Sequence, residues 1–287
     1  MTCFTLNGKA VISQSSPSTR LSDVLRSEMG LSGTKVGCNA GDCGACSVLL
    51  DDAPICSCLT TVAQVDGAKV TSIEGLNAEN TISKLQESFL AHGAAQCGIC
   101  TPGMMVAAHA LLNKNPTPKR CEVEDALGGV LCRCTGYGKI IDAVLAAGSD
   151  RFATLLPQSG SNVGIPIRHL DGQPKVDASL LYGDDAAPQD SVMVRVIRSP
   201  HHYASFKIGD KAAFLAKYPE IMAVLDASDI PGRNCFGVIP PFADQPVFAE
   251  ETVLYRGDAV AAIVGEADVV ARFDEADFPI TWYPHDA

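Results

Sequence analysis

The sequence predicts an α+β protein made of three consecutive segments that differ in periodicity. The first segment, to about residue 76, alternates apolar and polar residues in short runs, which is typical of strands. The second, to residue 150, carries apolar residues at helical spacing. The third returns to short β-type runs after a stretch rich in turn-forming residues. We therefore expect domains at 1–76, 77–150 and 164–287, with residues 151–163 as a linker.

Two hairpins and a short helix are expected in the first segment. Asn7-Gly8 lies between two short alternating runs and is a strong hairpin signal. Asp51-Asp52 occupies the corresponding place in a second pair of runs. Between the hairpins, Ser18 is placed to cap an amphipathic helix at 21–29. A glycine-rich loop separates this helix from the second hairpin, so the segment reads as a small mixed α/β unit.

Four short helices are expected in the second segment. The first carries Leu85 and Phe89 on one face. Thr101-Pro102, a cap residue followed by proline at the first helical position, opens the next helix. Two shorter helices are expected at 123–130 and 140–147. Four helices of this length favour a compact bundle.

The third segment reads as α+β. Apolar runs at 192–197, 222–225 and 259–264 predict strands. Residues 211–218 have the spacing of a helix. Proline and glycine occur frequently between these runs and mark the turns.

Bulk properties exclude several classes of function. The chain of 287 residues has a formal net charge of −11 and shows no basic stripe for phosphate contacts, so nucleic acid is not an expected partner. Its N-terminus carries no export signal, and its apolar runs are too short to span a bilayer. We therefore expect a cytoplasmic protein without membrane insertion.

Twelve cysteines are the strongest chemical signal, and eleven of them lie in the first 134 residues. Without an export signal, such cysteines are metal ligands more often than disulfides. Cys38, Cys43 and Cys46 have the C-x4-C-x2-C spacing of plant-type [2Fe–2S] sites, which need a distant fourth cysteine. Cys56 and Cys58 are both candidates, because alternation along a strand puts them on one face. A structural zinc ion is the alternative occupant.

A second cysteine group lies in the helical segment. Cys97 and Cys100 form C-x2-C just before the Thr101-Pro102 helix, and Cys132 and Cys134 form C-x-C where a later helix ends. Two thiolate pairs at helix ends can converge in a bundle. Taken alone, this pattern fits zinc as well as an iron–sulfur cluster.

Other residues receive simpler interpretations. Cys3, Cys121 and Cys235 have no partners in either pattern and are expected to be small buried apolar residues. Lys35, within the first cysteine motif, would either raise a cluster potential or form a surface salt bridge. Asp184-Asp185 is expected to be a pair of solvated loop acids.

Together the two cysteine groups resemble the iron–sulfur portion of molybdenum hydroxylases, the xanthine dehydrogenase and aldehyde oxidoreductase family. The resemblance rests on GCNAGDCGAC and SCL in the first segment and on QCGICTPGMM and LCRCTGY in the second. It covers residues 1 to about 150 and implies a plant-type ferredoxin-like β-grasp domain and a four-helix domain, each with one [2Fe–2S] cluster. The ligands it implies are Cys38, Cys43, Cys46 and Cys58 for the first cluster and Cys97, Cys100, Cys132 and Cys134 for the second.

The resemblance also assigns individual positions. It rejects Cys56, because the fourth ligand of the family lies in the SCL triplet. Gln96 matches a glutamine that contacts the pterin of the molybdenum cofactor in relatives, where the helical-domain cluster is the nearer one. Val130 stands where relatives usually have asparagine, which affects one local polar contact and leaves the ligation intact.

The third segment is similar to the α/β hammerhead domain that opens the molybdenum portion of these enzymes. The similarity rests on KVDASLLYGDD, VRVIRSPHHYASF and VLYRGDAVAAIVGE. The glycine-rich segment that holds the molybdopterin in relatives, and their C-terminal catalytic glutamate, have no counterpart in this sequence. We therefore expect an iron–sulfur subunit fused to a hammerhead-like domain, with no catalytic residue of its own.

The function implied by the resemblance is electron transfer within a multi-subunit oxidoreductase. A molybdopterin-binding large subunit would hydroxylate an N-heteroaromatic or purine compound or oxidise an aldehyde. Two [2Fe–2S] clusters would then pass the electrons singly to an external acceptor, such as a flavin subunit or a cytochrome. The alternatives are a freestanding two-cluster electron carrier and a non-catalytic metal-binding redox protein.

Overall fold

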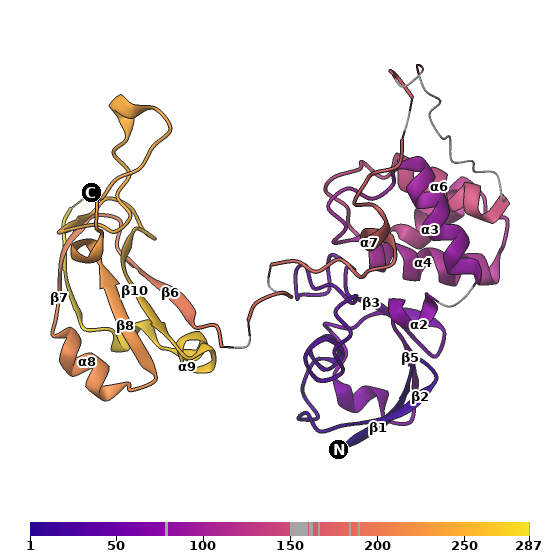
Figure 1. Ribbon diagram of the computed structural model, residues 1–287. Coiled ribbons are helices and arrows are strands. Elements are labelled where there is room, and N and C mark those ends of the chain that lie inside the picture. Colours follow the sequence, from indigo (N-terminus) through magenta and orange to yellow (C-terminus); the bar gives the residue numbers. More distant parts are fainter. Residues whose placement is uncertain are drawn as a thin grey trace. The chain divides into compact units, whose positions relative to one another are not determined.

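The computed structural model describes residues 1–77, 80–149, 160, 163–165, 167–183, 185–188 and 190–286. The chain forms two compact units, residues 1–186 and 187–287 (Figure 1). Most of the expected linker at 151–163 lies outside the described residues. Within the part of the chain that is described, no helix is long and apolar enough to cross a membrane.

The first unit begins with a five-stranded sheet in the order β2-β1-β5-β3-β4. Its strands are β1 (Thr2–Leu6), β2 (Lys9–Ser13), β3 (Ser47–Leu50), β4 (Ala53–Cys56) and β5 (Lys69–Thr71). Both predicted hairpins are confirmed, β1 with β2 and β3 with β4. Asn7-Gly8 and Asp51-Asp52 all have positive φ, as type I′ hairpin turns require. Strand β5, which pairs parallel to β1, was not predicted, because three residues are too few to show a period.

The helix predicted at 21–29 differs in form from the expectation. A short α-helix, α1 (Leu21–Asp23), runs directly into a π-helical turn at Val24–Glu28. The prediction that Ser18 caps it is wrong, because Arg20 occupies the N-cap position and the Ser18 hydroxyl bonds within the preceding loop. The helix still covers the sheet, and together they bury a core of Phe4, Leu6, Leu21, Val24, Leu25, Val48, Val62, Val65 and Val70.

Helices form the second half of the first unit, and the four predicted ones are confirmed. They are α3 (Asn80–His92), α4 (Thr101–Lys114), α5 (Arg120–Leu127) and α6 (Gly138–Ser149), preceded by the short α2 (Ile73–Leu76). Helix α3 packs on α6 and α4, and α4 also packs on α5 and on strand β3. Leu49 of β3 is buried in the same core as Phe89 and Met104 of the helices. The sheet and the helices therefore share one continuous core.

The first unit ends later than the sequence-based domain boundary at residue 164. Residues 171–186, which we call the connecting segment, pack on the helices through α7 (Gln173–Val176). Val176 and Ala178 are fully buried in the helical core. The connecting segment belongs to the first unit because it buries apolar side chains there.

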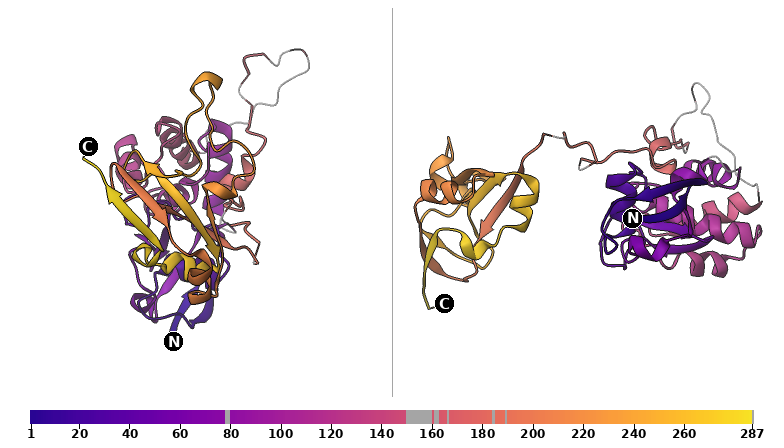
Figure 2. Two further views of the ribbon diagram at one scale, coloured as in Figure 1. Left: turned by 90° about the vertical axis from the view of Figure 1, so that its left-hand side faces the viewer. Right: turned by 90° about the horizontal axis from the view of Figure 1, so that it is seen from below.

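The second unit contains two three-stranded antiparallel sheets, in the orders β6-β10-β8 and β11-β7-β9 (Figure 2). The strands are β6 (Met193–Arg198), β7 (Ala204–Ile208), β8 (Ile221–Asp226), β9 (Thr252–Val253), β10 (Ala259–Gly265) and β11 (Ile280–Pro284). Helix α8 (Lys211–Lys217) is capped by the Asp210 carboxylate, and α9 (Ala267–Arg272) follows β10. Strands β6, β8 and β10 and helix α8 match the predictions. Strands β7, β9 and β11 were missed because they are short or mix polar residues with apolar ones.

The connecting segment is tied to the first cysteine motif by a buried ion cluster. Asp185 accepts hydrogen bonds from Arg26 and, at 3.3 Å, from Lys35. The Asp185 and Lys35 side chains are 4% and 3% exposed. The expectation that Asp185 is a solvated loop acid is therefore wrong, because the carboxylate is buried. The sequence could not show this, since the partners of Asp185 lie far away along the chain. Asp184 lies outside the described residues.

The surroundings of Asp185 favour its charged form. Burial by itself would raise the pKa of this carboxyl. The hydrogen bonds from the Tyr182 amide and Arg26 and the charge of Lys35 outweigh burial and lower the pKa to about 2. Burial lowers the pKa of the Lys35 ammonium, and the charge of Asp185 opposes that effect. A carboxyl whose pKa is depressed on folding stabilises the folded state above its unfolded pKa. This stabilisation amounts to about 2 kcal/mol and is lost as the pH falls from ~4 to ~2.

The ion cluster predicts the effect of Asp185→Asn. The change should lower the free energy of unfolding by about 3 kcal/mol at neutral pH, because it leaves the buried Lys35 charge without its counter-ion. The difference between the variant and the wild type should shrink as the pH falls from ~4 to ~2. Urea unfolding of both proteins across this range measures it. Asp52→Asn is the matched control, because Asp52 pairs with Lys69 at 3.1 Å but both side chains are exposed. It should cost less than ~1 kcal/mol, and equal effects of the two changes would contradict the prediction.

Candidate metal centres

The first cysteine group lies on the loop that leads into strand β3. Ala40 N and Cys43 N donate hydrogen bonds to Cys38 Sγ at 3.3 and 3.4 Å, and Cys38 N donates to Cys43 Sγ at 3.3 Å. The amide bonds, first that of Ala40, lower the pKa of Cys38 to about 7. Cys46, directly before β3, is buried and in contact with the buried Cys58. The predicted ligands are therefore brought together as two pairs, Cys38 with Cys43 and Cys46 with Cys58.

A fifth thiol lies in the same place. Cys56, the last residue of β4, is half-buried, and its Sγ lies 3.7 Å from the Gly41 carbonyl oxygen. Its side chain also contacts that of Cys46. Burial raises the pKa of both Cys56 and Cys58, the latter to about 11. The sequence pattern left Cys56 and Cys58 as alternatives, and the structure brings both to Cys46.

The second cysteine group also consists of two pairs. Cys97 contacts Cys134, and Cys100 contacts Cys132. The prediction that Thr101 caps α4 is wrong by one residue, because Cys100 itself occupies the N-cap position. Its thiol therefore lies at the positive end of a helix.

Hydrogen bonds hold Cys132 in place. Thr135 donates to Cys132 Sγ through its amide at 3.4 Å, and its hydroxyl lies 3.2 Å from the same sulfur. Cys132 N donates to Tyr137 Oη at 2.9 Å. Burial by itself would raise the pKa of the Cys132 thiol. The hydrogen bonds from Thr135 and from the Cys134 amide outweigh burial, so the pKa of Cys132 is lowered. Burial raises the pKa of Cys100, which has fewer such bonds.

The two pairs of the second group face different surroundings. Cys97 and Cys134 are exposed, as is Gln96 beside them. Cys100 is buried and Cys132 half-buried. The second group thus has an outward pair next to Gln96 and an inward pair within the unit.

The loops that carry the two cysteine groups touch each other, and we call this the loop contact. Leu131 N donates to the Cys43 carbonyl oxygen at 2.9 Å. A Cβ on Gly44 would lie 2.0 Å from the Gly129 carbonyl oxygen, and a Cβ on Gly103 would lie 2.4 Å from the Gly44 carbonyl oxygen. The backbones therefore approach so closely that only glycine fits at these positions.

The paired arrangement bears on which metal the thiols would hold. Among the described residues, no three His, Cys, Asp or Glu side chains are placed to hold one metal ion. Tetrahedral zinc needs four ligands around one point. A [2Fe–2S] cluster has two irons and takes two ligands on each. Two thiol pairs with amides that donate to sulfur therefore suit a [2Fe–2S] cluster better than a zinc ion.

The remaining cysteines do not behave as predicted. Cys3 and Cys121 are exposed and Cys235 is half-buried, so the prediction of buried apolar residues is wrong. Cys3 lies on the outward side of β1, whose alternate residues face the core. Cys121 lies in the first turn of α5 on its solvent side. Val130, where the resemblance predicts asparagine, is buried in the helical core.

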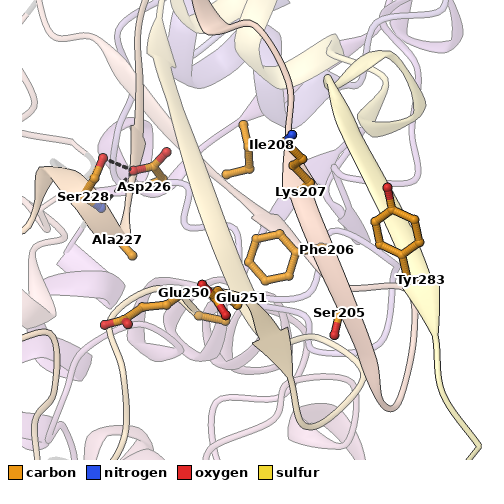
Figure 3. A pocket seen from close by; sticks show the side chains of 11 residues that line it. Ser205, Phe206, Lys207, Ile208, Asp226, Ala227, Ser228, Glu250, Glu251 and Tyr283 are labelled. Carbon is orange, nitrogen blue, oxygen red and sulfur yellow. Dashed lines mark hydrogen bonds between the residues drawn. The ribbon is translucent and has the colours of Figure 1, made fainter.

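A hollow of about 800 Å³ lies in the second unit (Figure 3). Phe206, Glu250 and Tyr283 line it, together with Asp226 and Ser228. Asp226 accepts hydrogen bonds from the Ser228 amide and hydroxyl at 2.9 and 2.6 Å. Since Glu250 also accepts a bond from Asn234, these acids serve local structure. Asp226 and Glu250 are therefore both held by hydrogen bonds to neighbouring residues.

Comparison with protein families matches three parts of the chain. Residues 4–69 match the 2Fe-2S iron-sulfur cluster binding domain and residues 72–145 the [2Fe-2S] binding domain. Residues 177–277 match the aldehyde oxidase and xanthine dehydrogenase a/b hammerhead domain. The third match begins within the connecting segment, before the second unit starts.

Relatives include both long and short proteins. An aldehyde oxidoreductase of Megalodesulfovibrio gigas is 33% identical over an alignment of 273 residues, and the match covers 88% of this chain and 30% of that protein. The nicotinate dehydrogenase small FeS subunit of Eubacterium barkeri is 46% identical over 139 residues, which are 48% of this chain and 88% of that subunit. The structure of aldehyde oxidoreductase from Desulfovibrio gigas covers 100% of this chain with a TM-score of 0.87 at 31% identity, and this chain covers 34% of it. The chain thus spans about a third of the aldehyde oxidoreductases that it matches.

The loop contact predicts that Gly44→Ala is strongly destabilising. The new Cβ would collide with the Gly129 carbonyl, and the residue has φ +64°, which is unfavourable for alanine. We expect the free energy of unfolding to fall by about 3 kcal/mol, measured by urea unfolding. Gly67→Ala is the matched control, because Gly67 has φ +74° but nothing lies within 4 Å of its Cβ position. It should cost only about 1 kcal/mol. Similar losses in both variants would mean that the close approach contributes nothing.

Proposed function

Because the chain belongs to the molybdenum hydroxylase family of aldehyde oxidases and xanthine dehydrogenases, we propose that it is the electron-transfer subunit of such an enzyme. It would work with a molybdopterin-binding large subunit. Each [2Fe–2S] cluster, when bound, supplies one-electron transfer, and two in series let the two electrons of a molybdopterin centre leave singly. The proposed ligands are Cys38, Cys43, Cys46 and Cys58 for the first cluster and Cys97, Cys100, Cys132 and Cys134 for the second.

The thiol pairs support this assignment. Each contacting pair would hold one iron, so that a cluster bridges the two pairs of its group. In the first group, the amides of Ala40 and Cys43 already donate to the Cys38 sulfur and favour its thiolate. In the second, Thr135 does the same for Cys132. Hydrogen bonds to sulfur are also a means by which a protein sets a cluster potential.

The loop contact is the observation that carries the proposal. Electron tunnelling falls steeply with distance, so two centres in series must lie close together. Cys43 and Leu131 are joined by a 2.9 Å hydrogen bond, and Leu131 is covalently linked to Cys132. A ligand of the first group is therefore one hydrogen bond and one residue away from a ligand of the second. Gly44 and Gly103 allow this approach.

The exposure of the ligands supports a direction for the flow. The outward pair, Cys97 and Cys134, lies beside the exposed Gln96. We assign this face to the large subunit, with Gln96 contacting the pterin of its cofactor. Electrons would leave at the exposed part of the first cysteine loop, residues 37–42, toward an acceptor such as a flavin subunit or a cytochrome.

Substrate class and location belong to the proposal as well. The named relatives act on an aldehyde or on nicotinate, so we place the substrate of the complex among aldehydes, N-heteroaromatic compounds and purines. None of the twelve cysteines forms a disulfide. Cysteines without disulfides suit a reducing compartment, which supports a cytoplasmic location.

Metal analysis is the first test. Protein purified under anaerobic conditions from its native source should contain about four irons per chain, two in each cluster. Molybdenum should co-purify, held by the large subunit. Four irons without molybdenum would instead favour a freestanding two-cluster carrier. Zinc in place of iron would favour a non-catalytic metal-binding protein and contradict the proposal.

Cys43→Ser tests the relay in the assembled complex. The variant should still allow substrate to reduce molybdenum in a single turnover, because the large subunit is intact. Steady turnover should fall to background, because the exit through the first cluster is lost. Rapid-freeze electron paramagnetic resonance (EPR) and a steady-state assay measure the two effects. Cys121→Ser, at an exposed cysteine outside both groups, is the control and should retain both activities. Full steady turnover in Cys43→Ser would refute the relay.

A further inference from the structure

We propose that Cys56 is a reserve ligand of the first [2Fe–2S] cluster, able to bind iron in place of Cys58. This inference rests on the proposed function, because it requires a cluster in the first cysteine group. Five thiols lie in that group, and four suffice for the cluster. The family resemblance selects Cys58, so Cys56 has no assigned role.

Cys56 and Cys58 have the same neighbours. Both side chains contact Cys46, the thiol that is to share an iron with the fourth ligand. Both also contact Gly41. The Cys56 thiol donates to the Gly41 carbonyl oxygen, and the Gly41 amide donates to the Cys58 sulfur. A sulfur at either position therefore lies next to the same partner thiol and the same loop.

The intervening residue holds this arrangement. Ser57 is fully buried, its hydroxyl donates to the Cys46 carbonyl oxygen at 2.7 Å, and its amide donates to the same oxygen at 3.4 Å. Strand β4 ends at Cys56, and residues 57–59 form a turn in which Leu59 N donates to the Cys56 carbonyl oxygen at 3.1 Å. With Ser57 fixed on the Cys46 backbone, this turn brings the Cys58 thiol to Cys46 beside the thiol of Cys56.

The exchange needs no oxidant or reductant. The Cys56 thiol gives up its proton and forms a bond to iron, while the Cys58 sulfur leaves the same iron and takes up a proton. One iron–sulfur bond forms, one breaks, and the charge is unchanged. Cys56 is half-buried and Cys58 is 2% exposed, so Cys58 is the better shielded ligand. This explains why Cys58 is used first and Cys56 is held in reserve.

The test counts iron and records EPR spectra of the dithionite-reduced full chain, prepared anaerobically. Wild type and Cys56→Ala should both contain about four irons per chain. Cys58→Ala should also contain about four, with one of its two cluster signals altered by the changed ligand. The double variant Cys56→Ala/Cys58→Ala should contain only about two. Cys43→Ala is the matched control and should also fall to about two, since Cys56 contacts the other thiol pair.

Each outcome separates the reserve ligand from the proposed function. About two irons in Cys58→Ala, with about four in the wild type, would overturn the reserve ligand and leave the relay intact. About four irons in the double variant would also overturn it, because another group would then supply the bond. Zinc or no iron in the wild type would overturn the proposed function itself. If Cys58→Ala does not fold, Cys58→Val and its double variant with Cys56→Ala give the same comparison, because valine has no atom that can bind iron.

Discussion

The contact between the two cysteine loops is the constraint on which the first unit depends. It is made of backbone alone, a 2.9 Å hydrogen bond from Leu131 N to the Cys43 carbonyl with glycines packed beside it. Regular structure lies on both sides of the contact. Strand β3 begins directly after Cys46, the loop with Gly129 and Leu131 runs from the end of α5 to the start of α6, and Gly103 of α4 lies against Gly44. Since β3 and α4 pack in one core, the two loops are held at their rigid ends. The distance between the candidate centres is thus fixed by packing, which side-chain rotation cannot change.

The connecting segment adds a second link between the same two regions. Tyr182 Oη donates to the Cys97 carbonyl oxygen at 2.6 Å, and Lys35 Nζ donates to the Leu180 carbonyl oxygen at 2.8 Å. Lys35 also lies 5.0 Å from the centre of the Tyr182 ring. Burying Lys35 and Asp185 costs desolvation energy, and for Asp185 the hydrogen bonds and charges of Tyr182, Arg26 and Lys35 outweigh that cost. The pair also fixes the path of the chain over both cysteine loops.

Local chemistry was readable from the sequence, and long-range partners were not. Both hairpins, the four helices and the two cysteine motifs follow from patterns within a few residues, such as Asn7-Gly8 or the spacing of Cys38 and Cys43. The pairing of Cys46 with two thiols, and the burial of Asp185 against Lys35, depend on residues brought together by folding. A single charged residue in a loop looks the same in sequence whether the fold leaves it in solvent or places it against a distant cation. Cys3 and Cys121 were misjudged for a related reason, because the apolar character of cysteine does not specify which face of an element it occupies.

The uneven exposure of the cysteines has a consequence for how the protein would be used. The inward thiols, Cys100 and Cys132, are shielded, whereas Cys97 and Cys134 are open to solvent. Oxidants reach an exposed cysteine more readily than a buried one, so an uncovered outward pair would be vulnerable. A partner that covers Cys97, Cys134 and Gln96 would exclude water and oxidants from this edge and would bring its own redox centre close to it. Protection and electron entry would then require the same surface, so a single partner would serve both needs.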